Sequence, residues 1–236
     1  MICRTKKILS VLLLVSLTSA CAVHYSQTEW AKILRGNEYG HVFYHQIDDK
    51  PGKLPKVYQP NTSPSILSDY NAESGVRGGS RTRIHEGIDF YGEIGDPIIS
   101  AANGVVIDAG ARYCMGPMIH VDHGTGSDGN SLLSFYLHAS EILVKKDDVI
   151  KRGQLIGTVG KTGKSDGVPH LHFSVYSKKR SPNPGDLGDA LYVENKSSLN
   201  PHKYWSGGAF RPECFNPSKT YPTDHTVFTI PLQCRG

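Results

Sequence analysis

The sequence has little of what long helices, coiled coils, collagen or disordered chains require. None of its 236 residues belongs to a convincing long amphipathic helical pattern, an internal repeat or a low-complexity block. With 38% hydrophobic and 20% charged residues, the chain can bury one substantial core. This composition excludes the fibrous and wholly disordered classes and favours one globular domain with additional segments.

Most of the chain also has almost no excess of positive over negative charge. The formal net charge is +4, but residues 1–21 contain Arg4, Lys6 and Lys7 and no acidic residue, so the remainder lies near +1. A protein that follows nucleic-acid phosphates concentrates Lys and Arg on one face. We therefore expect no nucleic-acid partner.

The first 21 residues lack the length of a membrane span and resemble an export signal. Their apolar run, Ile8 to Leu17, is shorter than the roughly 20 residues that cross a bilayer. A basic start and small residues before Cys21 are typical of signal peptides. Two cleavage sites remain open: a lipobox that leaves a lipidated Cys21 anchored to the outer membrane, and an ordinary A-x-A site at Ala20-Cys21-Ala22. Both predict an exported, periplasmic protein.

Cysteines are few, and only Cys114, Cys214 and Cys234 follow the signal. Disulfides persist outside the cytoplasm. We expect a Cys214–Cys234 bridge that closes about 20 residues and contributes about 3 kcal/mol. Cys114 is then the odd thiol, and its pairing with the tail remains an alternative.

Residue composition and patterning divide the chain into four parts: 1–21, which is the expected signal, 22–75, 76–205 and 206–236. After the signal, residues 22–75 are rich in turn formers and predict a linker or loosely packed segment. Residues 76–205 contain short β-branched and aromatic runs between Gly, Asn-Gly and Asp-Gly signals, which predict an all-β domain with strands near 105–107, 131–138, 154–160 and 171–176. Residues 206–236 form a tail without regular patterning.

Three of the expected strand segments place polar side chains, including the histidines, on one face. In a strand, residues i and i+2 share a face. The polar faces carry His85, Gly87 and Asp89; then Ser134, Tyr136 and His138; and then His170, His172, Ser174 and Tyr176. This distribution is what a sheet with a core on one side and a polar cleft on the other requires.

Other catalytic patterns are incomplete. The segment G-T-V-G-K-T-G-K-S does not keep P-loop spacing, and the sequence contains no G-x-S-x-G. His41 and His45 have helical zinc-pair spacing, but Val42 stands where H-E-x-x-H needs Glu. Cys114 has no nucleophile signature around it.

Five motifs occur together and in order: H-E-G-I-D-F at 85–90, D-P-I-I-S-A-A-N-G-V-V at 96–106, F-Y-L-H-A-S at 135–140, V-I-K-R-G-Q-L-I-G-T-V-G-K-T-G at 149–163 and P-H-L-H-F-S-V-Y at 169–176. Together they resemble the signatures of the lysostaphin or LytM-type zinc endopeptidases. The resemblance covers roughly residues 76–205 and implies an antiparallel, all-β LytM-type peptidase domain.

The resemblance also implies the site. It assigns one Zn²⁺ per chain to His85, Asp89 and His172, and catalytic roles to His138 and His170. Zn²⁺ held by three protein ligands keeps one position open, as catalytic zinc sites do. The implied activity is hydrolysis of peptide bonds in peptidoglycan stems or cross-links. The alternative is an inactive relative that binds and activates cell-wall amidases.

Several positions around the expected site have other interpretations. His120 and His123 are expected to be surface or supporting residues rather than ligands, and Glu86 to lie on the opposite face from His85. We expect the region around 110–131 to form the loops of the substrate cleft. The bond that is cut, and whether residues 22–75 cover the zinc, are not determined by these patterns.

Overall fold

The structure, a computed structural model, describes residues 57–72, 85–112, 115–126, 129–178 and 196–235. The expected signal, Cys21 and Cys114 lie outside the described residues, as do most of 22–75 and the pair His41 and His45. The boundaries expected at 21 and 75 therefore stay predictions, and the boundary expected at 205 stays one as well. Among the described residues, no helix has the length and apolar character needed to cross a membrane.

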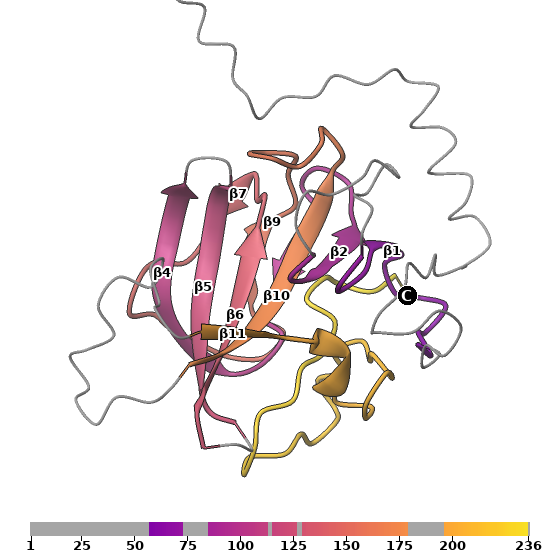
Figure 1. Ribbon diagram of the computed structural model, residues 1–236, viewed down its shortest axis with the longest axis vertical. Coiled ribbons are helices and arrows are strands. Elements are labelled where there is room, and N and C mark those ends of the chain that lie inside the picture. Colours follow the sequence, from indigo (N-terminus) through magenta and orange to yellow (C-terminus); the bar gives the residue numbers. More distant parts are fainter. Residues whose placement is uncertain (1–56, 73–84, 113–114, 127–128, 179–195, 236) are drawn as a thin grey trace, which may run out of the picture.

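The described chain is built almost entirely of antiparallel strands, which confirms the expected all-β class (Figure 1). An eight-stranded sheet has the order β1-β2-β10-β6-β5-β4-β8, with β11 paired to β10. A second sheet has the order β3-β9-β7. The elements are β1 (Ile66–Ser68), β2 (Ile88–Tyr91), β3 (Pro97–Ile99), β4 (Gly104–Arg112), β5 (Gly116–Thr125), β6 (Ser131–Leu137), β7 (Glu141–Ile142), β8 (Val149–Ile150), β9 (Leu155–Thr158), β10 (His170–Lys178), β11 (Lys196–Leu199) and a 3-10 helix, η2 (Pro201–Lys203).

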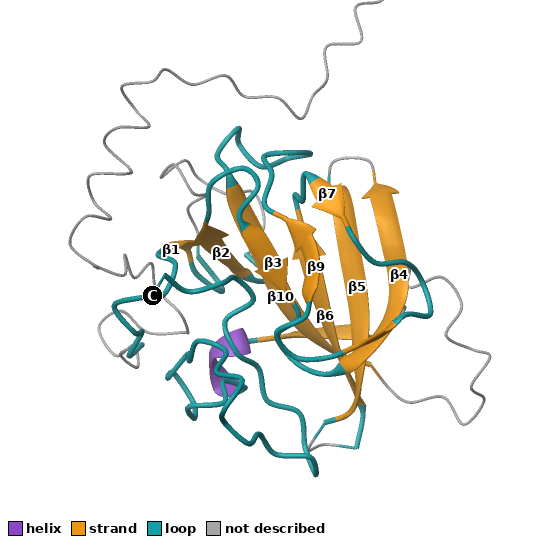
Figure 2. Cartoon of the chain, turned by 180° about the vertical axis from the view of Figure 1, so that it is seen from behind, coloured by secondary structure: helices purple, strands orange, loops and turns teal. Residues whose placement is uncertain are grey.

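The main core lies between the two sheets. Figure 2 shows the small sheet in front of the large one, and Ile98 of β3 and Ile156 of β9 are fully buried in one cluster with Phe173 of β10. On β10 the alternation is as expected, because the apolar residues Leu171, Phe173 and Val175 all lie in this cluster. Its histidines therefore project from the opposite face of the sheet.

The C-terminal residues complete the core instead of trailing from it. Trp205, Phe228, Ile230 and Leu232 are buried in the main cluster. The backbone continues the small sheet through an isolated bridge between Ile98 and Leu232. The expected bridge is present, since Cys214 and Cys234 form a disulfide with their Cα atoms 5.9 Å apart.

The alternation predicted for 131–138 is wrong about Tyr136. Tyr136 lies in the main core, whereas Leu133 and Phe135 form a second buried cluster on the other face with Met118 and Tyr176. Both faces of β6 are covered, so apolar and polar positions do not separate along it. The loops expected around 110–131 are likewise largely strand, because β5 occupies Gly116–Thr125.

His123 is expected to make folding stability fall in acid. Burial lowers the pKa of this ring from 6.5 to about 4. His123 therefore binds a proton near pH 6.5 in the unfolded chain, but only near pH 4 in the folded chain. Stability is full above pH 6.5 and falls by about 3 kcal/mol as the pH drops to 4. Urea unfolding at pH 7, 5.5 and 4.5 measures this loss.

The variant His123→Gln is expected to lose this part of the pH dependence. The matched control is His225→Gln, because the His225 side chain is 45% exposed and pairs with Asp224. Equal acid slopes for the wild type and His123→Gln would contradict the prediction.

Candidate metal centre

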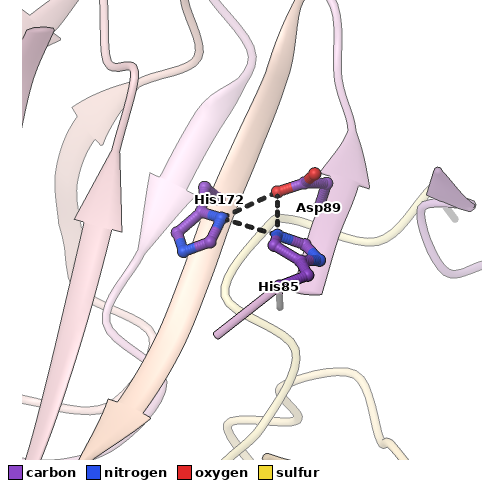
Figure 3. Close-up of side chains that lie close together, drawn as sticks. All are labelled: His85, Asp89 and His172. Carbon is purple, nitrogen blue, oxygen red and sulfur yellow. Dashed lines mark hydrogen bonds and ion pairs between the residues drawn. The ribbon is translucent and has the colours of Figure 1, made fainter. Parts of the chain in front are cut away.

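Strand pairing brings Asp89 and His172 together. In the antiparallel pair β2–β10, His172 lies directly opposite Asp89, so their side chains share a face. His172 Nδ1 is 2.8 Å from Asp89 Oδ1. Figure 3 shows both side chains pointing toward one another from neighbouring strands, with His85 completing the group.

His85 lies in the segment just before β2, and its side chain contacts Asp89 and His172. Its Nδ1–H donates to the backbone oxygen of Asp69 at 2.7 Å, and its own carbonyl accepts from the backbone N–H of Asn71 at 2.8 Å. Because Nδ1 carries the proton, the lone pair of Nε2 faces Asp89 and His172. His85 Nε2 is 3.1 Å from Asp89 Oδ1 and 3.0 Å from His172 Nδ1.

These three donor atoms fit a divalent metal ion. His85, Asp89 and His172 are the group whose potential ligand atoms all lie within 4.8 Å of one another in the described part of the chain. Two ligands at about 2.1 Å in a tetrahedral site are about 3.4 Å apart, a few tenths of an ångström more than the separations of 2.8 to 3.1 Å seen here. Two imidazoles and one carboxylate are also a donor set that zinc and similar ions accept.

Gly87 gives the His172 ring its space. A Cβ at this position would lie 2.7 Å from His172 Nε2 and 2.6 Å from the Phe173 carbonyl oxygen. Contacts this short do not occur without displacement of the ring or the strand. The absence of a side chain at Gly87 therefore sets the orientation in which Nδ1 of His172 faces Asp89.

The buried Asp89 carboxylate is held in its charged form. Burial alone opposes the charge, but attraction from His85 and His170 and hydrogen bonds from His172 and His85 keep the pKa of Asp89 well below its usual value. Burial acts in the other sense on His172 and lowers its pKa despite the hydrogen bond to Asp89. Loss of the ring protons that face Asp89 would leave an anion beside nitrogen lone pairs, which is the state that binds a cation.

The two remaining histidines lie beside this group. The ring centres of His138 and His170 are 4.8 Å apart, and His170 Nε2 is 3.7 Å from Asp89 Oδ1. Each ring donates its Nδ1–H to a backbone carbonyl, of Thr162 for His138 at 2.9 Å and of Val168 for His170 at 2.8 Å. Nε2 is therefore the ring nitrogen of each histidine that does not bind these carbonyls, and in His170 it faces Asp89.

His138 reaches the site by a route that strand alternation did not predict. It follows the last residue of β6 and has a positive φ of 68°. This left-handed conformation redirects the side chain at the strand end. Burial, together with repulsion from His170 and His172, holds the pKa of His138 well below its usual value.

All the expected site residues except His85 line one cleft. Its wall also includes three residues that sequence reasoning did not single out, Lys164, Ser165 and Asp166. Ser165 Oγ donates to the Lys161 carbonyl at 2.7 Å, and Asp166 has a positive φ of 53°. Their signal was a polar run that ends two residues before P-H-L-H.

The neighbouring polar residues do not join the three candidate ligands. His120 and His123 are buried rather than on the surface, and His123 lies between the Asn103 carbonyl and Ser134 Oγ, each at 2.7 Å. Neither belongs to the group of His85, Asp89 and His172. Glu86 accepts a hydrogen bond from Tyr176 Oη at 2.9 Å.

Comparison with known proteins gives a family for this arrangement. Residues 83–184 match Peptidase family M23. The peptidoglycan DD-endopeptidase ShyA of Vibrio cholerae is 38% identical over 103 residues, which are 44% of this chain and 23% of ShyA. ShyC of the same organism, also named a peptidoglycan DD-endopeptidase, is 34% identical over 188 residues, 72% of this chain and 42% of ShyC.

One solved structure among the similar ones is the catalytic domain of lysostaphin from Staphylococcus simulans, at 30% identity and a TM-score of 0.41, covering 50% of this chain and 84% of that domain. The matched region spans less than half the length of ShyA and of ShyC. The resemblance drawn from the sequence motifs is confirmed for residues 83–184, which match Peptidase family M23.

Proposed function

We propose that this protein is a zinc-dependent metalloendopeptidase that hydrolyses peptide bonds in the stems or cross-links of peptidoglycan. The observation that carries the proposal is the convergence of His85 Nε2, Asp89 Oδ1 and His172 Nδ1, with mutual separations of 2.8 to 3.1 Å. The names of ShyA and ShyC, both peptidoglycan DD-endopeptidases, support the substrate class.

His85, Asp89 and His172 hold the ion in this proposal. Zn²⁺ bound there supplies a Lewis acid that activates water and polarises the scissile carbonyl. Three protein ligands would leave one coordination position for water or substrate, as in catalytic rather than structural zinc sites.

His138 and His170 handle protons in the proposed reaction. Both rings keep Nδ1–H bonded to a backbone carbonyl, so Nε2 is the atom that takes a proton from the attacking water and returns one to the leaving amine. The C–N bond breaks, the carbonyl carbon gains the water oxygen, and no covalent enzyme intermediate forms. Once protonated, either ring also donates a hydrogen bond to the developing oxyanion.

The chain is proposed to act outside the cytoplasm. The expected export signal and the cell-wall substrates named for the relatives support a periplasmic location. Acylation of Cys21 would anchor the protein to the outer membrane, and mass spectrometry of the mature N-terminus distinguishes this from ordinary cleavage at the same signal.

Purified protein incubated with purified sacculi tests the function. We expect release of soluble muropeptides that a chelator abolishes and added Zn²⁺ restores, and mass spectrometry of the products identifies the bond. The competing function, a regulator that activates amidases, predicts no release by the pure protein but stimulation of a cell-wall amidase. That pattern would overturn the proposed peptidase activity.

A further inference from the structure

A buried carboxylate–histidine pair lies behind the candidate metal centre and has no part in the proposed reaction. Asp69 and His202 are both fully buried, and His202 Nε2 is 2.7 Å from Asp69 Oδ1. They are 133 residues apart in the sequence. Burying a carboxylate is costly unless hydrogen-bond donors surround it, so such a pair requires a reason.

Trp205 fixes how this pair is protonated. Its Nε1–H donates to His202 Nδ1 at 2.9 Å. Nδ1 of His202 is therefore an acceptor, and Nε2 carries the proton that is donated to Asp69. Trp205 itself is locked in the core against Phe90 and Phe173, with ring centres 6.3 and 6.2 Å away. The C-terminal segment thus holds the Nε2–H of His202 in a fixed position facing Asp69.

The turn that begins at Asp69 holds His85 at two points. The Asp69 carbonyl accepts both the His85 Nδ1–H at 2.7 Å and the backbone N–H of Ala72 at 3.2 Å. The N–H of Asn71 binds the His85 carbonyl at 2.8 Å. Within the same turn, Asp69 Oδ1 also accepts the backbone N–H of Tyr70 at 2.7 Å. The Asp69 side chain therefore braces the carbonyl that orients the His85 ring.

We propose that Asp69 and His202 are positioning residues for His85: the C-terminal segment, through His202, fixes the Asp69 turn, and the turn fixes the tautomer and direction of the His85 ring. This inference rests on the proposed role of His85 as a metal ligand. Partners of this kind set the basicity and orientation of a ligating imidazole, and their loss typically lowers metal affinity about 10- to 100-fold.

Metal affinity and ligand geometry test the proposal in the full-length protein. Metal-free wild type, Asp69→Ala and His202→Ala are titrated with Zn²⁺ in competition with a chelating indicator. Visible absorption spectra are then recorded after loading with Co²⁺. We expect both alanine variants to bind Zn²⁺ about 10- to 100-fold more weakly and to show shifted Co²⁺ bands.

Two further variants separate positioning from a merely structural role. Asp69→Asn keeps a side-chain oxygen for the same two N–H donors and is expected to restore wild-type affinity. Thr229→Val is the matched control, because it deletes a fully buried hydroxyl that donates to the Ala101 carbonyl at 3.1 Å elsewhere in the core. It is expected to lose stability but to keep the metal affinity and the Co²⁺ spectrum.

The outcomes are distinct. Wild-type affinity and spectra in Asp69→Ala and His202→Ala would overturn the positioning role. If these variants fail to fold, Trp205→Phe keeps an aromatic ring in the core but removes the N–H that fixes His202 together with part of the indole, and an affinity equal to that of Thr229→Val would overturn the role equally well. A wild type that binds no Zn²⁺ would contradict the proposed function and not the arrangement described here.

Discussion

Replacing Asp89 by Ala is expected to abolish stoichiometric zinc binding and, with it, peptidoglycan cleavage. The carboxylate is the only anion of the candidate ligand set, and it lies within about 3 Å of both histidine nitrogens. Its loss removes a ligand outright and should cost more than the roughly 10- to 100-fold associated with a supporting residue. Elemental analysis of the purified variant, with muropeptide release from sacculi, measures both effects.

The double variant Asp89→Ala with His172→Ala is a more stringent test, because only one imidazole of the candidate ligand set then remains. His225→Ala is the control, because it also removes a histidine paired with an aspartate, but at an exposed position. Zinc retained at one ion per chain in the double variant would refute the ligand set. Loss of zinc in His225→Ala would point to nonspecific binding.

Replacing His138 by Ala is expected to leave zinc in place and to lower turnover about 100- to 10,000-fold, the range typical of lost proton transfer. Its Nε2 is free to exchange a proton, and the ring lies beside the ligand set, with centres of His138 and His172 6.1 Å apart. His170→Ala is expected to behave in the same way. Rates of muropeptide release at saturating sacculi, with zinc measured on the same samples, check the prediction.

The zinc measurement distinguishes catalysis from binding. Unchanged turnover in His138→Ala would remove its catalytic role, whereas loss of both zinc and turnover would make it a ligand. Comparing the alanine variants of His138 and His170 also shows whether the two act as one unit, because the double variant would then be no slower than either single variant.

The sequence pattern predicted which face of a strand joins the main core where all the aliphatic residues lie on that face. On β10, apolar Leu171, Phe173 and Val175 alternate with the two histidines, and the structure keeps that division. On β6 both faces are buried, so a period of two could not distinguish the core side, and Tyr136 was misplaced. His138 joins the site through a backbone turn that the side-chain pattern does not encode.

Local sequence patterns could not predict contacts between segments that lie far apart in the chain. Asp69 lies in a region rich in turn formers, and its partner His202 is 133 residues away, so neither residue shows a local signal. In the tail, Phe228, Ile230 and Leu232 do alternate as in a strand, but Pro231 interrupts the run and argues against one. Their burial follows from tertiary packing.

The register of β2 against β10 makes ion capture and folding a single equilibrium. Asp89 and His172 are 83 residues apart and meet only when these strands are paired. An ion that binds the paired strands and not the unfolded chain adds to stability by mass action, about 2.7 kcal/mol at a free concentration one hundred times the dissociation constant. Under the proposed zinc binding, the melting temperature is therefore expected to rise with the concentration of free zinc.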